Sequence, residues 1–274
     1  MAILPNPSPL ERLRRLAVRS GIGAAGHLPP SVLRAVNIAR GIDTPRVVDH
    51  PAGTRPVVVA PHPDDELIGV GGTIVHHLAA GHAVHVVHVT SGERTTGLTH
   101  LPAAERAAAR EAEARAAAAR IGVDDAHVHL LRCADGQVGH EATHLERLSA
   151  TLATIAPDLV YAPWPVDAHR DHTATTRMLA DALPHLPSVE WIALYEVWSP
   201  LAPTHIVDIS DSIDAKLDAV GCYASALTSV DYVHTARGLA AYRSAQGLRG
   251  RGHGEAFTVV DGDGLRDMLG RLAL

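Results

Sequence analysis

The stretch Val57-Val-Val-Ala-Pro-His-Pro-Asp-Asp-Glu66 joins a short apolar run to a histidine and three consecutive carboxylates. The apolar run predicts a buried strand, and the segment 66–80 that follows has helical periodicity. Like charges repel one another, and the end of a buried strand is a costly place for three carboxylates unless a positive group is bound there. A metal ion is the simplest such group, so this stretch predicts a strand-to-helix unit with a metal site between its two elements.

Short β-branched runs alternate with longer helical segments through much of the chain. The sequence predicts strands at 57–60, 83–90, 127–131, 159–162 and 191–195, with helices at 66–80, 103–121, 142–155 and 172–183 between them. This order is typical of βαβ units and predicts an α/β fold with a Rossmann-like, mainly parallel sheet flanked by helices. Ligands bind such sheets beyond the carboxyl ends of the strands. The charged residues of the 103–121 helix are expected to form a solvated face.

The 274 residues are expected to form an N-terminal helical extension, 1–50, followed by one main domain, 51–274. The extension contains helical stretches near 10–18 and 31–40. After residue 195 we expect a short strand at 205–209, a helix beginning at Ser210 or Asp211, and a further helical stretch within 225–256. The glycine-rich run 247–254 is interpreted as a mobile loop, and these C-terminal segments as lid elements over the site.

Composition argues against several classes of partner. A net charge of -6 without a long Lys/Arg block is unlike a surface for nucleic acid or anionic lipid. There is no apolar segment of membrane-spanning length and no signal-peptide core, so a cytoplasmic protein is expected. Cys133 and Cys222 are far apart in the sequence and fit reduced thiols. A homo-oligomer remains open.

Histidine is unusually frequent, with 19 residues in the chain. A count of histidines does not locate a site, whereas their spacing relative to strands can. We therefore expect the histidines that crowd one helix end and the strand after it to be half-buried polar groups and not metal ligands: His76, His77, His82, His85 and His88.

A second polar cluster, Trp164-Pro-Val-Asp-Ala-His-Arg-Asp-His172, follows the fourth predicted strand. Both polar clusters follow strands, so they can meet at one edge of the sheet although they are far apart in the chain. Two histidines and one carboxylate, with a fourth position left for water, are the composition of a catalytic zinc site. A structural zinc site more often includes cysteines, and neither cysteine is suitably placed.

The segments Ala60-Pro-His62-Pro-Asp-Asp-Glu66 and His169-Arg-Asp-His172 resemble the two signature motifs of the PIG-L/LmbE family of zinc-dependent N-deacetylases. Further matches run from about residue 55 to about residue 260: Gly71-Gly-Thr, Thr90-Ser-Gly-Glu93, the helix 106–122, Asp135-Gly136, Tyr195-Glu-Val-Trp, Val207-Asp-Ile-Ser210, Lys216 and Glu255-Ala-Phe257. The resemblance implies hydrolysis of the N-acyl group of a small-molecule amino sugar or its glycoconjugate. In the family this reaction serves thiol-cofactor biosynthesis or the tailoring of glycosylated natural products such as antibiotics.

The resemblance also implies roles for individual residues. His62, Asp65 and His172 correspond to the ligands of Zn²⁺, and Asp64 to the general base that takes a proton from the attacking water. Adjacent side chains point in different directions, which is compatible with this division between Asp64 and Asp65.

Two further roles follow from the same motifs. His169 would stabilise the oxyanion as an imidazolium, with Asp171 orienting it. Glu66 is expected to cap the following helix or to make a supporting hydrogen bond.

The substrate rim is predicted from the loops after successive strands, 92–100, 132–140, 163–168 and 196–204. One departure from the family bears on the substrate, because Tyr223-Ala-Ser-Ala226 stands where many members have His-x-Ser-Gln. The candidate substrate-binding residues are Glu93, Arg94, Asp135, Trp164 and Trp198.

Three other functions fit the sequence less well than deacetylation. Gly69-Val-Gly-Gly72 lacks the spacing of a dinucleotide-binding loop, and these glycines more plausibly allow a helix to approach a neighbour closely. A metal-dependent phosphoesterase would need more shared carboxylates, for which Asp135 and Asp167 are the only candidates. A non-catalytic sugar-binding module would be expected to have lost the base, yet Asp64 is present.

Overall fold

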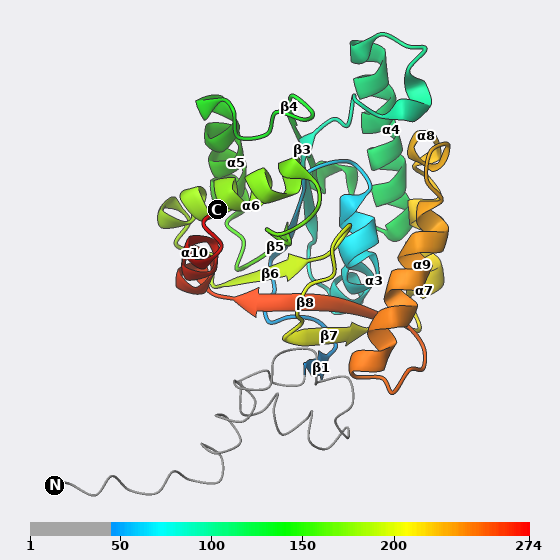
Figure 1. Ribbon diagram of the computed structural model, residues 1–274, viewed down its shortest axis with the longest axis vertical. Helices are drawn as coiled ribbons and strands as arrows, with labels where there is room; N and C mark the ends of the chain where they lie inside the picture. Colours follow the sequence, from blue (N-terminus) through cyan, green and yellow to red (C-terminus); the bar gives the residue numbers. More distant parts are fainter. Residues whose placement is uncertain (1–44) are drawn as a thin grey trace, which may run out of the picture. The chain divides into compact units, whose positions relative to one another are not determined.

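The computed structural model describes residues 45–274, in which one sheet of eight strands forms the centre (Figure 1). The strand order is β1-β7-β8-β6-β5-β2-β3-β4. The helices predicted near 10–18 and 31–40 lie outside the described residues. The strands are β1 (Arg46–Val48), β2 (Pro56–Ala60), β3 (His85–Thr90), β4 (Val128–Cys133), β5 (Leu159–Pro163), β6 (Trp191–Tyr195), β7 (His205–Asp208) and β8 (Gly254–Val260).

Helices cover both faces of this sheet, as Figure 1 shows. One face carries α3 (Asp65–Ala79), α4 (Ala103–Ile121), α7 (Ile213–Val220), α8 (Ala224–Leu227) and α9 (Tyr232–Arg243). The other face carries α5 (Ala142–Ile155), α6 (Arg170–Ala182) and α10 (Gly262–Arg271). Short 3₁₀ turns lie at Thr96–Leu98, Asp125–His127, Leu183–His185 and Ser244–Gln246.

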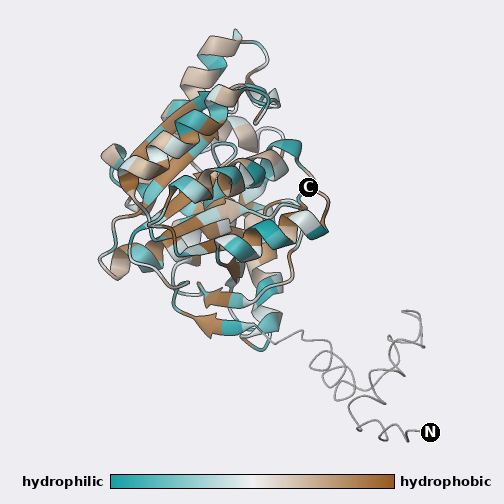
Figure 2. Cartoon of the chain, turned by 90° about the vertical axis from the view of Figure 1, so that its left-hand side faces the viewer, coloured by the Kyte–Doolittle hydropathy of each residue, from teal (hydrophilic) through white to brown (hydrophobic). Residues whose placement is uncertain are grey.

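The core is divided into two apolar layers by the sheet itself. Strand side chains alternate between faces, so Val58 and Tyr161 pack in one layer while Val57, Val59 and Val160 pack in the other. Strands buried on both faces are expected to be almost continuously apolar, and β2 and β5 are fully buried along their length. Figure 2 shows hydrophobic residues concentrated on several of the strands.

The predicted α/β architecture and mainly parallel sheet are confirmed. β1 pairs with β7 in parallel, and so do all neighbours in the order β6-β5-β2-β3-β4. β8 and α10 were not predicted from the sequence. β8 begins at Gly254, the last residue of the glycine-rich run, and lies antiparallel between β6 and β7.

Helix α3 approaches its neighbours closely because its glycines leave room for bulky side chains. A Cβ atom on Gly69 would lie 2.2 Å from Cδ2 of Tyr195, and one on Gly72 would lie 2.5 Å from Cγ2 of Ile209. Both separations are too short for carbon atoms. The expected close approach is therefore confirmed, and it fixes α3, whose first turn carries the polar motif, against β6.

A buried ion pair fastens β8 to the helical layer. Glu255 in β8 lies 2.7 Å from the Lys216 ammonium of α7, and it accepts backbone hydrogen bonds from Gly72 and Thr73 of α3, each at 2.8 Å. Because both charged groups are satisfied, they can remain buried. Within 45–274, none of the helices combines the length and the hydropathy that crossing a bilayer requires.

Candidate active site

The two polar motifs meet where the strand order reverses. β2 is flanked by β3 and by β5, so the chain moves away from β2 toward β3 and β4 on one side and returns to β5 and β6 on the other. The first motif follows β2 and the second follows β5, and these strands are hydrogen-bonded neighbours, with Val58 opposite Tyr161. This reversal is where open α/β sheets bind ligands.

One carboxylate oxygen lies at the centre of the predicted ligand set. Oδ2 of Asp65 is 3.2 Å from Nδ1 of His62 and 3.2 Å from Nε2 of His172. It also accepts the backbone N–H of His62 at 2.9 Å. The His172 side chain is completely buried, and neither of its ring nitrogens has a hydrogen-bond partner among the described residues. The structure thus brings the three side chains together, with the buried Nε2 atom of His172 close to the Asp65 carboxylate.

A second group of carboxylates lies on the other side of His62. Its Nε2 atom is 3.2 Å from Oδ2 of Asp171 and 3.4 Å from Oδ1 of Asp135. Ring nitrogens of His62, His169 and His172 lie within 4.8 Å of one another, as do donor atoms of His62, Asp135 and Asp171. His62 is therefore shared by two groupings that could hold a metal ion.

The histidines and the carboxylates shift one another's proton affinities. Burial would raise the pKa of Asp65, but His172 and His62 together hold it well below its usual value. Burial lowers the pKa of His172, yet Asp65 and Asp167 raise it to about 9. An ionised Asp65 and cationic histidines therefore stabilise one another, and a divalent cation could take the place of the histidine protons.

Asp64 has an unusual backbone and a charged partner. Its φ of 116° lies in a region of backbone conformation that residues other than glycine rarely adopt. Asp64 is the N-cap residue of α3, although its side chain makes no capping hydrogen bond, and its N–H donates to Oε2 of Glu66 at 3.0 Å. Nη2 of Arg110 lies 2.9 Å from Oδ2 of Asp64. The Asp64 carboxylate is thus paired with the Arg110 guanidinium.

Burial dominates the proton affinities of the other two carboxylates. It raises the pKa of Asp64 to about 6, against the lowering effect of Arg110. It raises the pKa of Glu66 to about 8, although the Tyr223 hydroxyl donates to that side chain. Glu66 thus supports Asp64 through a hydrogen bond, as expected, and is uncharged at neutral pH.

The expectation that all charges of α4 form a solvated face was wrong for Arg110, which is 2% exposed. Arg110 shares a helix face with the buried residues Ala114, Ala117 and Ile121. Its position on the apolar face of an Ala-rich helix was a signal that sequence reasoning could have used.

The Asp171 main chain, and not its carboxylate, contacts the His169 ring, which differs from the expectation. Nδ1 of His169 accepts the backbone N–H of Asp171 at 3.2 Å, so that nitrogen carries no proton in this hydrogen bond. The Asp171 carboxylate instead contacts His62 and accepts the Gly136 N–H at 2.7 Å. Burial, followed by His62 and His172, lowers the pKa of His169. The geometry therefore favours a neutral His169 oriented by the Asp171 main chain, in place of an imidazolium oriented by its carboxylate.

A cavity of about 550 Å³ opens over these residues. Of the predicted rim residues, Arg94, Asp135 and Trp198 line it, and Trp198 is 49% exposed. Glu93 and Trp164 do not line the cavity.

The two remaining rim candidates contact other parts of the protein. Glu93 accepts the backbone N–H of Asp135 at 2.8 Å and so positions that residue. Trp164 packs against the buried cluster of Leu201, Ile206 and Ala256.

Residues of α8, of the loop after it and of the start of α9 complete the cavity, and the sequence did not predict them. Ala226, Ser229 and Tyr232 line it, and the Tyr232 ring lies edge-on to Trp198 with centroids 6.0 Å apart. Ala226 belongs to the segment that departs from the family pattern, and none of the three residues follows the end of a strand.

Comparisons with known proteins agree with the motifs. Residues 57–183 match the family GlcNAc-PI de-N-acetylase (PIG-L), which confirms the resemblance seen in the sequence. A probable N-acetyl-α-D-glucosaminyl L-malate deacetylase 2 of Bacillus anthracis is 29% identical over 182 residues, 62% of this chain and 80% of the relative.

Two solved structures share the fold. The N,N′-diacetylchitobiose deacetylase of Pyrococcus horikoshii superposes with a TM-score of 0.67 at 27% identity, covering 77% of this chain and 85% of that one. The 4-carboxy-2-hydroxymuconate hydratase of Pseudomonas putida superposes with a TM-score of 0.66 at 24% identity, covering 75% and 95%. The hydratase shows that this fold alone does not determine the reaction.

Removing the Arg110 charge should destabilise the protein in a pH-dependent way. At pH 7, Arg110→Ala should lower the free energy of unfolding by about 3–5 kcal/mol, because it leaves Asp64 and Glu113 without their cation and the Pro63 carbonyl without its donor. The Asp64 pKa in the folded protein is raised above the ordinary value of 3.8, so ionised Asp64 opposes folding above that range. The difference from wild type should therefore shrink as the pH falls from 7 toward 4.

Urea denaturation at several pH values measures this effect. Arg120→Ala, which breaks the exposed pair with Asp218, is the matched control and should change stability by less than about 1 kcal/mol. An Arg110→Ala loss of equal size at every pH would contradict the role of Arg110 as the counter-charge of Asp64.

Proposed function

We propose that this chain, whose residues 57–183 match the PIG-L family, is a metal-dependent hydrolase that removes the N-acyl group from an amino sugar or its glycoconjugate. The observation that carries the proposal is the meeting of both signature motifs at the base of one open cavity, with Asp64 beside the His62–Asp65–His172 cluster. The relatives named as deacetylases of N-acetylated sugars support the same reaction.

The metal is proposed to be Zn²⁺, held by His62, Asp65 and His172. Zinc bonds of about 2.0–2.1 Å in a tetrahedral site place neighbouring ligand atoms about 3.3 Å apart. The two 3.2 Å separations around Oδ2 of Asp65 fit that spacing. When bound, the ion would lower the pKa of a coordinated water and polarise the acyl carbonyl.

Asp64 is proposed as the general base. Asp64 lines the cavity next to the proposed metal ligands. Because Arg110 opposes the rise in pKa that burial causes, the Asp64 carboxylate is ionised at neutral pH. A base with a pKa near the working pH is well suited to accept a proton from water and return it to the leaving amine.

His169 is proposed to donate a hydrogen bond to the carbonyl oxygen as negative charge develops there. Its Nδ1 atom accepts the Asp171 N–H, which leaves Nε2–H as the donor, and His169 lines the cavity. A fixed donor at this position stabilises the transition state more than the substrate.

The sugar is proposed to occupy the cavity between Arg94, Asp135 and Trp198. The exposed Trp198 ring offers an apolar surface for a pyranose face, while Arg94 and Asp135 offer polar groups. A volume of about 550 Å³ is within the range of small-molecule sites.

A panel of N-acetyl and longer N-acyl glucosaminides, free and attached to larger aglycones, tests the function. The purified protein should release one free amine and one carboxylic acid per turnover from its best substrate, detected by amine derivatisation and by acid quantification. If a metal-loaded protein releases no amine from any member of the panel, the proposal fails. Hydration of an unsaturated acid without amide cleavage would point to hydratase chemistry instead.

Metal analysis tests the ligand set. Asp65→Ala and His172→Ala should each hold about one Zn²⁺ per chain less than wild type and should lose activity, because each removes a ligand. His140→Ala, an exposed histidine substitution, is the control and should match wild type. Full zinc content in His172→Ala, measured by elemental analysis after dialysis, would remove that residue from the ligand set.

Asp64→Asn tests the base separately from the metal. The amide fills the same space but accepts no proton, so kcat should fall ~10²–10⁴-fold while zinc content is kept. The acidic limb of the kcat/KM profile, expected where Asp64 becomes protonated as the pH is lowered, should disappear or shift in the variant. Steady-state kinetics across pH measure both effects, and near-normal turnover would overturn the mechanism.

The two tryptophans should respond differently to substitution. Trp198→Ala should raise KM about 10-fold, because it removes an aromatic face worth about 1.4 kcal/mol from the cavity. Trp164→Ala should leave KM unchanged and lower the free energy of unfolding by about 3 kcal/mol, because Trp164 packs against buried side chains. Kinetics and denaturation of both variants make the comparison; equal KM values for Trp198→Ala and wild type would remove Trp198 from the rim.

A further inference from the structure

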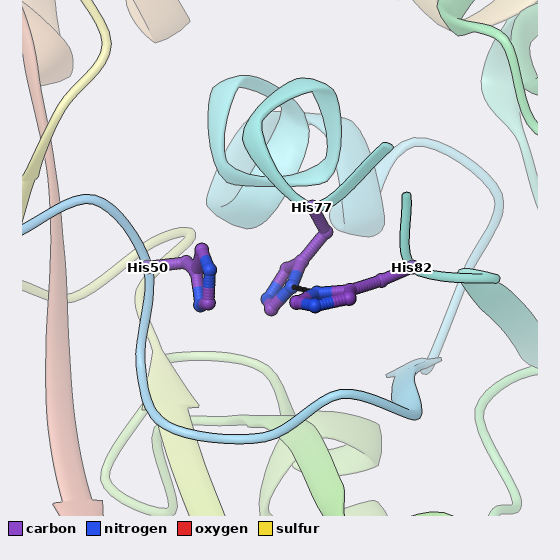
Figure 3. A group of neighbouring side chains, drawn as sticks. All are labelled: His50, His77 and His82. Atoms are coloured by element: carbon purple, nitrogen blue, oxygen red, sulfur yellow. Dashed lines mark hydrogen bonds between the residues drawn. The ribbon is translucent and has the colours of Figure 1, made fainter. Parts of the chain in front are cut away.

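A second group of histidines lies at the opposite end of α3 from the active site. His50 follows β1, His77 is in the last turn of α3, and His82 lies in the turn before β3; Figure 3 shows their rings facing one another. Each of the three histidines has a ring nitrogen that lies within 4.8 Å of a ring nitrogen of the other two. His77 is twelve residues after Asp65 on the same helix, about 18 Å along its axis. This cluster is therefore separate from the site already described.

The backbone holds these histidines together. Helix α3 ends in a tight turn in which the His82 N–H donates to the His77 carbonyl at 3.0 Å, and Gly81 has a φ of 80°. The loop that carries His50 is held beside the helix by His76, whose Nδ1 donates to the Asp49 carbonyl at 2.9 Å. Three segments of the chain thus present one imidazole each to a common point.

The nitrogen positions resemble those of a metal centre. Nδ1 of His77 and Nδ1 of His82 are 2.9 Å apart, close to the separation of about 3.3 Å between two imidazole ligands on one tetrahedral zinc ion. A small outward movement lets an ion replace the proton shared by these two nitrogens.

The groups around the cluster favour the required tautomers. Metal-binding histidines usually donate their other ring N–H to a nearby acceptor. Nε2 of His77 is hydrogen-bonded to the buried Tyr161 hydroxyl at 2.7 Å, and Nδ1 of His50 donates to the Pro51 carbonyl at 2.9 Å. When Nε2–H of His77 donates to the Tyr161 hydroxyl oxygen, Nδ1 of His77 keeps its lone pair, as does Nε2 of His50.

The three histidines differ in burial. His77 is completely buried, so the expectation of a half-buried side chain is wrong for this residue. His50 and His82 are partly exposed, which gives an ion access from solvent.

Against the expectation from the sequence that His77 and His82 are not metal ligands, we propose that His50, His77 and His82 form a second site for a divalent transition metal ion. This ion is Zn²⁺ in the first instance, with water completing its coordination. The absence of thiolates and the three imidazoles fit Zn²⁺, Ni²⁺ or Cu²⁺ better than Ca²⁺ or Mg²⁺. The role of this site is structural, because the ion would fasten the segment after edge strand β1 to the end of α3 and the turn before β3.

Zinc content and thermal unfolding test the proposal. Wild type, dialysed against a small excess of Zn²⁺ and then metal-free buffer, should hold one equivalent in this cluster in addition to any ion in the active site. His50→Gln and His82→Gln should each lose that equivalent and the zinc-dependent rise in Tm, while amidase activity is unchanged. These two partly exposed positions are chosen because substitution of buried His77 could prevent folding.

The matched control is His129→Gln. His129 belongs to another histidine pair, with Nε2 3.1 Å from Nδ1 of His85, and it should keep the wild-type zinc content and Tm response. Failure of the proposed active-site ligands is distinguishable, because it would leave His172→Ala at wild-type content while His82→Gln still loses an equivalent. Wild-type zinc content and Tm response in both His50→Gln and His82→Gln would overturn the second site.

Discussion

The parallel pairing of β2 with β5 is the constraint on which the candidate active site depends. Hydrogen bonds between these strands place the loops after Ala60 and Pro163 side by side, where the sheet order reverses. His172 reaches Asp65 only because of this pairing. A shift of one residue in the register would turn every side chain of one strand to the opposite face and separate the two motifs.

The three consecutive carboxylates are tolerated in the interior by three different means. Asp65 stays ionised between His62 and His172, and Asp64 faces the Arg110 guanidinium. Glu66 avoids the charge altogether, because burial favours its protonated form. The repulsion between the three carboxylates is therefore reduced in a different way at each residue. Only the charge of Asp65 is balanced by residues that would hold a metal.

Local sequence signals predicted most of the fold and the centre of the site. The Ala-rich helix α4 and the strand β6 have the predicted bounds, because propensity and hydrophobic pattern act within a few residues. Interactions between distant segments were not predictable in this way. The burial of Arg110 depends on which face of α4 meets the Asp64 loop, and His77 lies beside His50, which local spacing does not reveal. β8 was missed because its pairing with β6 and β7 is long-range and its first residue ends a glycine-rich run.

The position of β8 also determines the order in which the sheet can be completed. The neighbouring strands β6-β5-β2-β3-β4 come from successive βαβ units, so they can assemble as the chain leaves the ribosome. β7, and β1 beside it, can join them only through β8, which ends at Val260. During synthesis the loops that carry the two motifs thus precede the strand that closes the sheet, and the exposed edge of β6 remains unpaired until a segment about sixty residues later is made.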